Sequence, residues 1–275
     1  MQGGIMVGAR WEDASQNARF SCARSLGLLD YAEVHYPVSP AHNPGAMGLK
    51  ILAHASSNAL CSAHGIDMEV AQKVRAGALA ANSPWVGEHL ALLSPEGTCA
   101  LGQAINPLFT EEFVAISVVN ARQLAGLYGR PIALKLGPLY THPKGDYRSE
   151  MHFLAEVALA ANALIVLDLS HWTVSNKNLR RPPTFGFDHL PLERVVELQL
   201  AGWRKSPTQN LWHDAHEEPP GEEILALLAA VLPQLHQLKA VTLEQTMERS
   251  TEDFLLSLDK VHSVVEHHHG RRDSH

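Results

Sequence analysis

Residues 164–171, with the sequence LIVLDLSH, decide the fold. The run opens with four apolar residues in a row, a pattern typical of a parallel strand that is buried on both faces. It then turns polar at Asp168, Ser170 and His171. Seven more short apolar runs predict strands of the same kind: 5–9, 31–36, 49–55, 86–92, 132–137, 195–201 and 240–246.

Helical patterns lie between these strands. Asp67, Thr110 and Ser149 are suitable N-caps for three helices, and Pro220 opens another. The helix after Thr110 is expected to end at Gly129. Eight strands that alternate with helices favour a (β/α)8 barrel, the TIM-barrel fold, over an open sheet. The 275 residues accommodate such a barrel, which typically takes about 250.

The same pattern sets the expected domain organisation. We expect residues 1–266 to form a single TIM-barrel domain and residues 267–275 to form a flexible, histidine-rich tail. Two stretches, 141–148 and 172–189, are predicted to be long loops. Both would lie over the carboxyl ends of the strands, where the active sites of such barrels are found.

Composition narrows the classes of partner. The chain is 45% hydrophobic and 19% charged, which excludes a largely disordered protein. Its 22 Lys and Arg against 29 Asp and Glu, a net charge of -7, argue against nucleic acid as a partner. No stretch reaches the roughly 18 apolar residues of a membrane span. Three scattered cysteines, Cys22, Cys61 and Cys99, are typical of reduced thiols and predict a cytoplasmic protein.

Polar residues gather at the predicted carboxyl ends of the strands. They are His54, Glu88, His89, Lys135, Asp168, His171, Glu197, Gln199, Asp214, His216 and Glu244. Imidazole and carboxylate groups that converge from several chain segments suit iron, zinc or manganese. A buried carboxylate without a partner costs several kcal/mol, so several of them at one end of a barrel indicate a site.

Taken one at a time, these residues have simpler interpretations. His54 could be a hydrogen-bonded core histidine, and Asp168 could cap the following helix. Glu88 and Glu197 could form ion pairs with neighbouring Lys or Arg side chains. Cys61 is interpreted as a packing residue and not as a nucleophile.

The order of the motifs resembles that of the multinuclear non-haem iron-dependent oxidase family, which includes the methanobactin-biosynthesis oxidase. The resemblance covers about residues 8–264 and rests on LDYAEVH at 29–35, His54, GEHLA at 87–91, EMHFL at 150–154, LDLS at 167–170, VELQLAG at 196–202, DAH at 214–216 and LE at 243–244. It implies a xylose-isomerase-like TIM barrel with two or three iron ions. It also implies oxidative rearrangement of cysteine in a ribosomally made peptide, with a small peptide-binding partner protein.

The chain departs from the family pattern at two places. Where the family has Glu-Asn-Pro after the fifth strand, with the Glu bridging two metals, this chain has Lys135, Leu136 and Gly137. Where the family has His-Leu-Ala-Gly-His, this chain has Gln199 and Trp203 at the two histidine positions. The resemblance then leaves three ligand sets: His54 with His89, Asp168 with Glu244, and Asp214 with His216, which His171 could complete.

Lys135 has a physical interpretation. Without an ion, Asp168 and Glu244 would face each other, so one would take a proton or another cation would replace the metal. We predict that Lys135 takes the place of the second metal through ion pairs with both carboxylates. In the same pocket Gln199 would hydrogen-bond, Trp203 would narrow the mouth and Glu88 would contribute a carboxylate. The alternative is that the Lys135 side chain extends to solvent.

Three functions are compatible with this sequence. A divergent metal-dependent oxidoreductase acting on peptide cysteine would hold iron or zinc, in fewer than the three ions of the family. A metal-poor pseudoenzyme would instead serve as a peptide- or partner-binding scaffold in a modification complex. The third is a hydrolase or isomerase of the wider superfamily of metal-binding barrels.

Overall fold

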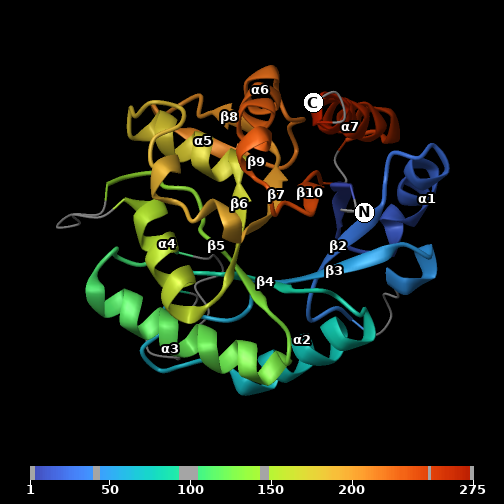
Figure 1. Cartoon of the computed structure of the whole chain (residues 1–275). Helices are drawn as coiled ribbons and strands as arrows, with labels where there is room; N and C mark the ends of the chain where they lie inside the picture. The colour runs from blue at the N-terminus through green and yellow to red at the C-terminus, as the bar shows by residue number, and fades with distance from the viewer. Residues whose placement is uncertain (1–3, 40–43, 93–104, 143–148, 247–248, 273–275) are drawn as a thin grey trace.

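Eight parallel strands close into a barrel at the centre of the molecule (Figure 1). The computed structural model describes residues 4–39, 44–92, 105–142, 149–246 and 249–272. The strands follow one another around the barrel in the order β1-β10-β7-β6-β5-β4-β3-β2, and β1 closes the ring by pairing with both β10 and β2. Their bounds are β1 Met6–Trp11, β2 Tyr31–His35, β3 Lys50–Ala55, β4 Val86–His89, β5 Ile132–Lys135, β6 Leu164–Asp168, β7 Val195–Leu200 and β10 Ala240–Leu243. The predicted (β/α)8 fold is confirmed.

Helices surround the strands, as Figure 1 shows. They are α1 Asn17–Ser25, α2 Met68–Ala80, α3 Glu111–Tyr128, α4 Glu150–Ala161, α5 Leu169–Asn178, α6 Glu222–Val231 and α7 Thr251–Arg272, with short 3-10 turns at Ala14–Gln16, Pro44–Met47, Phe187–His189, Leu192–Arg194 and Leu232–Gln234. The side chains of Asp67, Thr110 and Ser149 accept hydrogen bonds from the first-turn amides of α2, α3 and α4, as predicted. Gly129 ends α3 with a φ of 62°.

Apolar and polar residues divide the inside of the barrel. At the amino-terminal half, the buried residues Tyr31, Leu52, Trp85, Ala133, Val166, Val196 and Ala240 pack together. A larger apolar cluster lies between the strands and the helices. Burial of both faces explains why the strands are nearly continuous in apolar residues. The carboxyl-terminal half of the interior is left for polar side chains.

The region after β6 differs from the prediction. The sequence predicts a loop over residues 172–189, but α5 extends through Asn178 and is buried over most of its length. The Ser, Thr and Asn residues of α5 have low intrinsic helix propensity, so the sequence gives a weak helix signal. Burial against the rest of the protein supplies the stability that this helix needs. A second missed element is the antiparallel hairpin of β8 Gly202–Lys205 and β9 Trp212–Ala215. Most of the other predicted loop, 141–148, lies outside the described residues.

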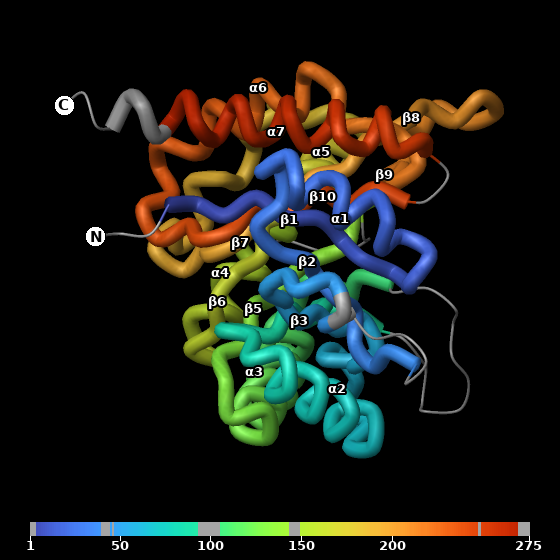
Figure 2. The backbone as a smooth tube through the Cα atoms, turned by 90° about the vertical axis from the view of Figure 1, so that its right-hand side faces the viewer, coloured from blue at the N-terminus to red at the C-terminus, as the bar shows by residue number. Residues whose placement is uncertain are grey.

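The last helix runs farther than expected. Residues 267–272, which the sequence assigns to a flexible tail, continue α7 to Arg272. Phe254, Leu258 and Val261 are fully buried and fix α7 against its neighbours α1 and α6 (Figure 2). Among the described helices, none is both long and apolar enough to cross a bilayer.

Candidate metal centre

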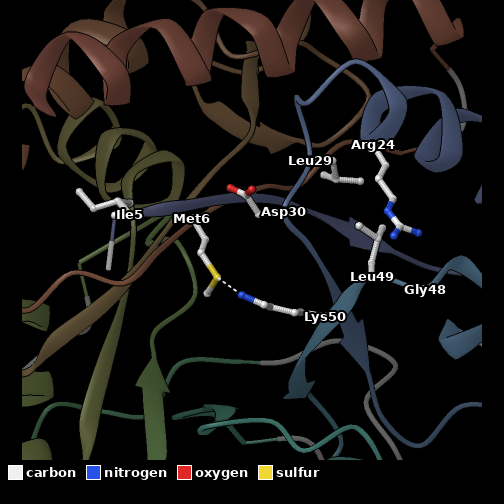
Figure 3. A pocket seen from close by; sticks show the side chains of 9 residues that line it. Ile5, Met6, Arg24, Leu29, Asp30, Gly48, Leu49 and Lys50 are labelled. Carbon is white, nitrogen blue, oxygen red and sulfur yellow. Dashed lines mark hydrogen bonds between the residues drawn. The ribbon is translucent and has the colours of Figure 1, made fainter. Parts of the chain in front are cut away.

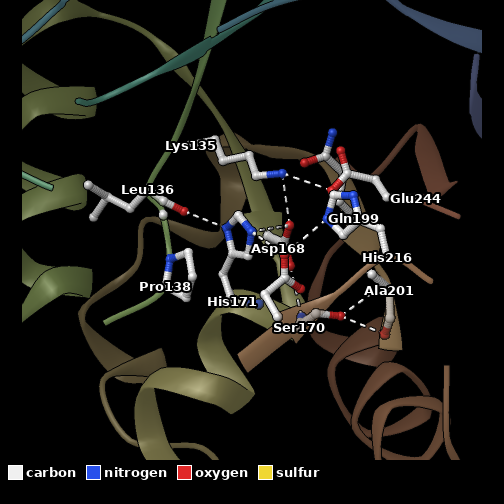
Figure 4. A network of polar contacts seen from close by, with 12 residues as sticks. Lys135, Leu136, Pro138, Asp168, Ser170, His171, Gln199, Ala201, His216 and Glu244 are labelled. Carbon is white, nitrogen blue, oxygen red and sulfur yellow. Dashed lines mark hydrogen bonds and ion pairs between the residues drawn. The ribbon is translucent and has the colours of Figure 1, made fainter. Parts of the chain in front are cut away.

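Lys135 lies at the centre of the polar end of the barrel (Figure 4). Its Nζ is 2.8 Å from Oδ2 of Asp168 and 3.1 Å from Oε2 of Glu244. Asp168 is the last residue of β6 and Glu244 follows β10, so the ammonium joins two strand ends across the barrel. All three side chains are at most 2% exposed. The predicted ion pairs of Lys135 are therefore present, and its side chain does not extend to solvent.

The electrostatics of this group are those of a buried cation between two anions. Burial alone would lower the pKa of Lys135, but Asp168 and Glu244 outweigh burial and raise it. Burial alone would raise the pKa of Glu244, but Lys135 and then His216 hold it well below its ordinary value. Lys135 and Glu244 thus stabilise each other's charged form, and the ammonium is compensated inside the protein by its two carboxylate partners.

Next to this group, His171, Asp214 and His216 converge as the sequence predicted. One ligand atom from each lies within 4.8 Å of the other two. Oδ2 of Asp214 is 3.4 Å from Nε2 of His171 and 3.0 Å from Nε2 of His216. The two groups are continuous, because His171 Nε2 is also 3.5 Å from Asp168 Oδ2 and His216 Nε2 is 3.4 Å from Glu244 Oε2.

Local structure orients His171. Asp168 caps α5, and its Oδ1 accepts hydrogen bonds of 2.8 Å from the amides of both Ser170 and His171. The imidazole Nδ1 of His171 donates to the carbonyl oxygen of Leu136 at 2.9 Å, because a carbonyl can only accept. This bond leaves Nε2 directed toward Asp214. Metal-binding histidines in proteins are commonly fixed in this way by a backbone carbonyl.

Both histidines of this cluster favour protonation. Burial lowers the pKa of His171, but Asp168 and Asp214 more than compensate and raise it. Burial likewise opposes protonation of His216, yet Glu244 and Asp214 raise its pKa to about 9. Arg10, whose Nη1 is 3.3 Å from Nδ1 of His216, acts in the opposite direction. Asp214 thus favours protonation of both imidazoles, and a metal ion bound here would have to displace those protons.

The donor atoms of this cluster fit a divalent ion. Two imidazole nitrogens and one carboxylate are the ligands of many three-residue catalytic sites. Asp214 Oδ1 and His216 Nε2 are buried and form no well-aligned hydrogen bond with the described residues. The position between Asp168 and Glu244, in contrast, does not fit a second ion, because the ammonium of Lys135 fills it.

A second group of histidines lies on the opposite wall, on β2, β3 and β4. Nε2 of His54 is 2.9 Å from Nε2 of His89, and Nδ1 of His54 is 3.4 Å from Oε2 of Glu33. Nε2 of His35 is 3.2 Å from Oε1 of Glu33. The sequence predicted His54 and His89 together but missed Glu33 and His35. Their signal was the alternation of Tyr31, Glu33 and His35, which turns all three side chains toward the barrel interior.

Glu33, His35 and His54 are close enough to suggest an ion, but the rings are in the wrong orientation. The imidazoles of His35 and His54 stack with centroids 4.4 Å apart and planes only 14° apart. The lone pair of an imidazole nitrogen lies in the ring plane, so two stacked rings cannot both direct theirs at one ion. Burial lowers the pKa of His54 to about 4, assisted by Lys135, which keeps this ring neutral.

Three residues expected in the pocket have other partners. Gln199 donates from Nε2 to Oε2 of Glu33, and not to the Asp168–Glu244 pair. Glu88 accepts from the Tyr128 hydroxyl and the Asn58 amide on the outer side of β4, so placing it in the pocket was wrong. Trp203 packs on the hairpin, where Nζ of Lys177 lies 4.3 Å above its ring. Side chains alternate between the two faces of a strand, which turns Glu88 away from the pocket. Trp203 belongs to the β8–β9 hairpin, which the sequence did not predict.

A cavity of about 810 Å³ opens beside the cluster. Asp214, His216 and Arg10 line its polar end, and the other lining residues are Ile105, Asn106, Pro107, Leu108, Pro138, Leu139, Tyr140 and Thr141. Another cavity, of about 510 Å³, lies at the amino-terminal ends of β1 to β3 (Figure 3). There Lys50 points toward Met6, and Asp30 is held by the amide of Val7. Since catalytic groups of TIM barrels lie at the carboxyl ends of the strands, the first cavity is the candidate substrate site.

Comparison with solved structures supports the fold. A xylose isomerase domain-containing protein from Salmonella typhimurium is similar with a TM-score of 0.63 and 14% identity, covering 95% of this chain and 97% of that one. A xylose isomerase domain protein from Planctomyces limnophilus has a TM-score of 0.60 and 12% identity, covering 99% of both chains. At these identities the likeness concerns the fold alone.

Comparison of sequences identifies the family. A UPF0276 protein from Caulobacter vibrioides is 25% identical over 248 residues, which cover 90% of this chain and 83% of that protein. The model of a family of enzymes that modify the precursors of ribosomally made peptides matches residues 41–265. That stretch includes every candidate ligand except Glu33 and His35. The chain belongs to the RiPP precursor modification enzyme family MbnB/TglH/ChrH.

Proposed function

We propose that this protein is a metal-dependent enzyme that modifies a ribosomally made precursor peptide and works with a single ion. His171, Asp214 and His216 would hold that ion, and the ammonium of Lys135 would stand where the family's second ion is expected. The observation that carries the proposal is the position of Lys135 Nζ, 2.8 Å from Asp168 and 3.1 Å from Glu244.

Electrostatics supports an ion at the His171, Asp214 and His216 cluster and opposes one between Asp168 and Glu244. A second ion between Asp168 and Glu244 would meet an ammonium at contact distance, and two cations that close repel strongly in a buried site. Between His171, Asp214 and His216, in contrast, the positive charges are on imidazolium groups, which can give up their protons to an incoming ion. Iron or zinc would suit this ligand set.

The residues around the ion have distinct roles in this proposal. An ion on these three ligands supplies a Lewis-acidic position that remains open to a substrate thiolate or to water. The Leu136 carbonyl keeps the His171 ring in place, and Lys135 contacts Oδ2 of Asp168 while Oδ1 of the same carboxylate caps α5. Arg10 at the rim would attract an anionic substrate group.

The cavity supports a peptide substrate. Ile105 and Leu108 are each 49% exposed and Tyr140 is 37% exposed, and all three line it. Exposed apolar side chains that border a polar site are typical of ligand-binding grooves. We propose that they hold a side chain next to the cysteine to be modified. Within the proposal, the peptide is presented by a small partner protein, and the reaction takes place in the cytoplasm, where Cys22 and Cys61 would stay reduced.

A metal-free scaffold is the second candidate function, and one observation favours it. The carboxylates of Asp168, Asp214 and Glu244 already face basic groups on Lys135, His171 and His216. The negative charges of this pocket are therefore balanced without any metal ion. A protein in that state would bind the precursor peptide and leave the chemistry to another subunit.

Metal content separates the two candidates. Protein purified from cells supplied with iron and zinc is expected to carry about one equivalent of metal, and His216→Ala is expected to lose it. The exposed His64 provides a control, since His64→Ala should retain the wild-type content. Less than roughly a tenth of an equivalent in the wild type would favour the scaffold. Two equivalents or more would contradict the assignment of Lys135.

A further inference from the structure

Helix α5 and the β8–β9 hairpin supply the candidate ligands from two separate segments. His171 is in the first turn of α5, Asp214 is in β9, and His216 follows β9 directly. A two-stranded hairpin has little stability of its own, so its position depends on what it contacts. The distances among the ligands therefore depend on how α5 holds the hairpin.

The side chain of Asn178, the last residue of α5, holds the backbone of β9. Its Nδ2 donates to the carbonyl oxygen of Trp212 at 3.0 Å, and its Oδ1 accepts from the amide of the same residue at 2.8 Å. One side-chain amide thus satisfies both backbone groups of Trp212, as a neighbouring strand would. Trp212 is two residues before Asp214, so the clamp fixes the strand where the ligand begins.

Two neighbouring contacts fix the same hairpin. Nζ of Lys177 lies 4.3 Å from the ring centroid of Trp203, in β8, and 5.0 Å from that of Trp212, in β9. At the other end of α5, Ser170 donates to the carbonyl of Ala201 at 2.8 Å and accepts from its amide at 2.7 Å (Figure 4). Ala201 comes immediately before β8, and Ser170 immediately before His171.

We propose that Asn178 is a positioning residue for the metal site, one that sets Asp214 and His216 at a fixed distance from His171. The inference rests on the proposed function, because it assigns a role toward the ion held there. Asn178 touches none of the three candidate ligands and acts through the backbone of Trp212; its Nδ2 also donates to the carbonyl oxygen of Leu139 at 3.1 Å. Outer residues that orient metal ligands typically affect metal affinity 10- to 100-fold.

The test compares Asn178→Ala with Asn176→Ala. Asn176 is on the same helix and also donates from its amide to a backbone carbonyl, but that carbonyl belongs to Pro183 and not to the hairpin. Asn178→Ala is expected to weaken Zn²⁺ binding about 10- to 100-fold and to change the visible spectrum of the Co²⁺-loaded protein. Asn176→Ala should change neither. Asn178→Asp, which retains the acceptor for the Trp212 amide, should fall between the wild type and Asn178→Ala.

Hydrogen exchange of the metal-free proteins separates this inference from the proposed function. Amides of residues 212–215 should exchange faster in Asn178→Ala than in the wild type or in Asn176→Ala. If Zn²⁺ affinity, Co²⁺ spectrum and exchange rates are the same in both alanine variants, Asn178 has no positioning role. If the wild type binds neither Zn²⁺ nor Fe²⁺, the proposed function fails and the metal role of Asn178 fails with it. Faster exchange would then still assign the clamp to Asn178.

Discussion

At the scale of the residue, Lys135 decides how the site is interpreted. A lysine that is 2% exposed is rare unless it is paired, and Lys135 has two carboxylate partners. An internal pair of this kind often adds little stability over an apolar replacement, but removing one partner is costly because it leaves the others uncompensated. The strongest effects are therefore expected when the charge at position 135 is changed.

Lys135→Glu reverses that charge and is expected to destabilise the metal-free protein by roughly 3–5 kcal/mol, because three carboxylates would then share one pocket. Urea unfolding in the presence of a chelator measures the loss. Addition of Zn²⁺ or Fe²⁺ should restore part of it in this variant, since the new carboxylate recreates the donor set that the family resemblance implies. Lys50→Glu, at the opposite end of the barrel, is the control for the change in net charge. Equal stability of Lys135→Glu and wild type would show that the pocket does not need its cation.

At the scale of the element, β4 shows how one strand serves two environments. His89 and Gly87 face the interior, where a Cβ at position 87 would lie 2.2 Å from Nδ1 of His54. Glu88 faces outward and joins β4 to the end of α3 through Tyr128. The sequence GEH thus combines a position without room for a side chain, an outward carboxyl and an inward imidazole. Reading it as one polar cluster placed Glu88 on the wrong side.

Glu88 also gives stability a pH dependence. Burial raises its pKa from 4.5 to about 8, although the hydrogen bonds from Tyr128 and Asn58 act in the opposite direction. Between pH 4.5 and 8 the folded protein keeps a proton that the unfolded chain has lost, so this residue makes stability fall as pH rises through that range. A tenfold difference in proton affinity between the folded and unfolded states corresponds to about 1.4 kcal/mol of stability.

Glu88→Gln removes the titrating group while an amide can still occupy its place. The variant is expected to gain stability over the wild type as pH rises from 4.5 to 8, with no gain at pH 4.5. Urea unfolding at several pH values measures the difference, and the exposed Glu112→Gln on α3 serves as the control. A pH-independent difference between Glu88→Gln and wild type would mean that Glu88 is ionised in the fold.

At the scale of the whole molecule, the sequence predicted those features that a single continuous stretch of residues identifies. All eight barrel strands were found because burial on both faces makes them apolar throughout. Asp214 and His216 were found because they stand together in the short motif DAH, with only Ala215 between them, and Lys135 because it stands at a strand end. Asp168 was recognised as a possible cap, but the length of α5 was missed because its stability comes from burial, which composition does not reveal. The stacking of His35 on His54 depends on the register of β2 and β3, where the two are partners, and no single segment carries that information.

The family resemblance and the geometry together make one claim: an internal ammonium stands where a second ion is expected. Crystals grown with excess Zn²⁺ or Fe²⁺ and measured with anomalous scattering at the metal edge test it most directly. We predict one strong peak among His171, Asp214 and His216, with Lys135 Nζ still between Asp168 and Glu244. A peak between Asp168 and Glu244, with the lysine turned away, would contradict the account.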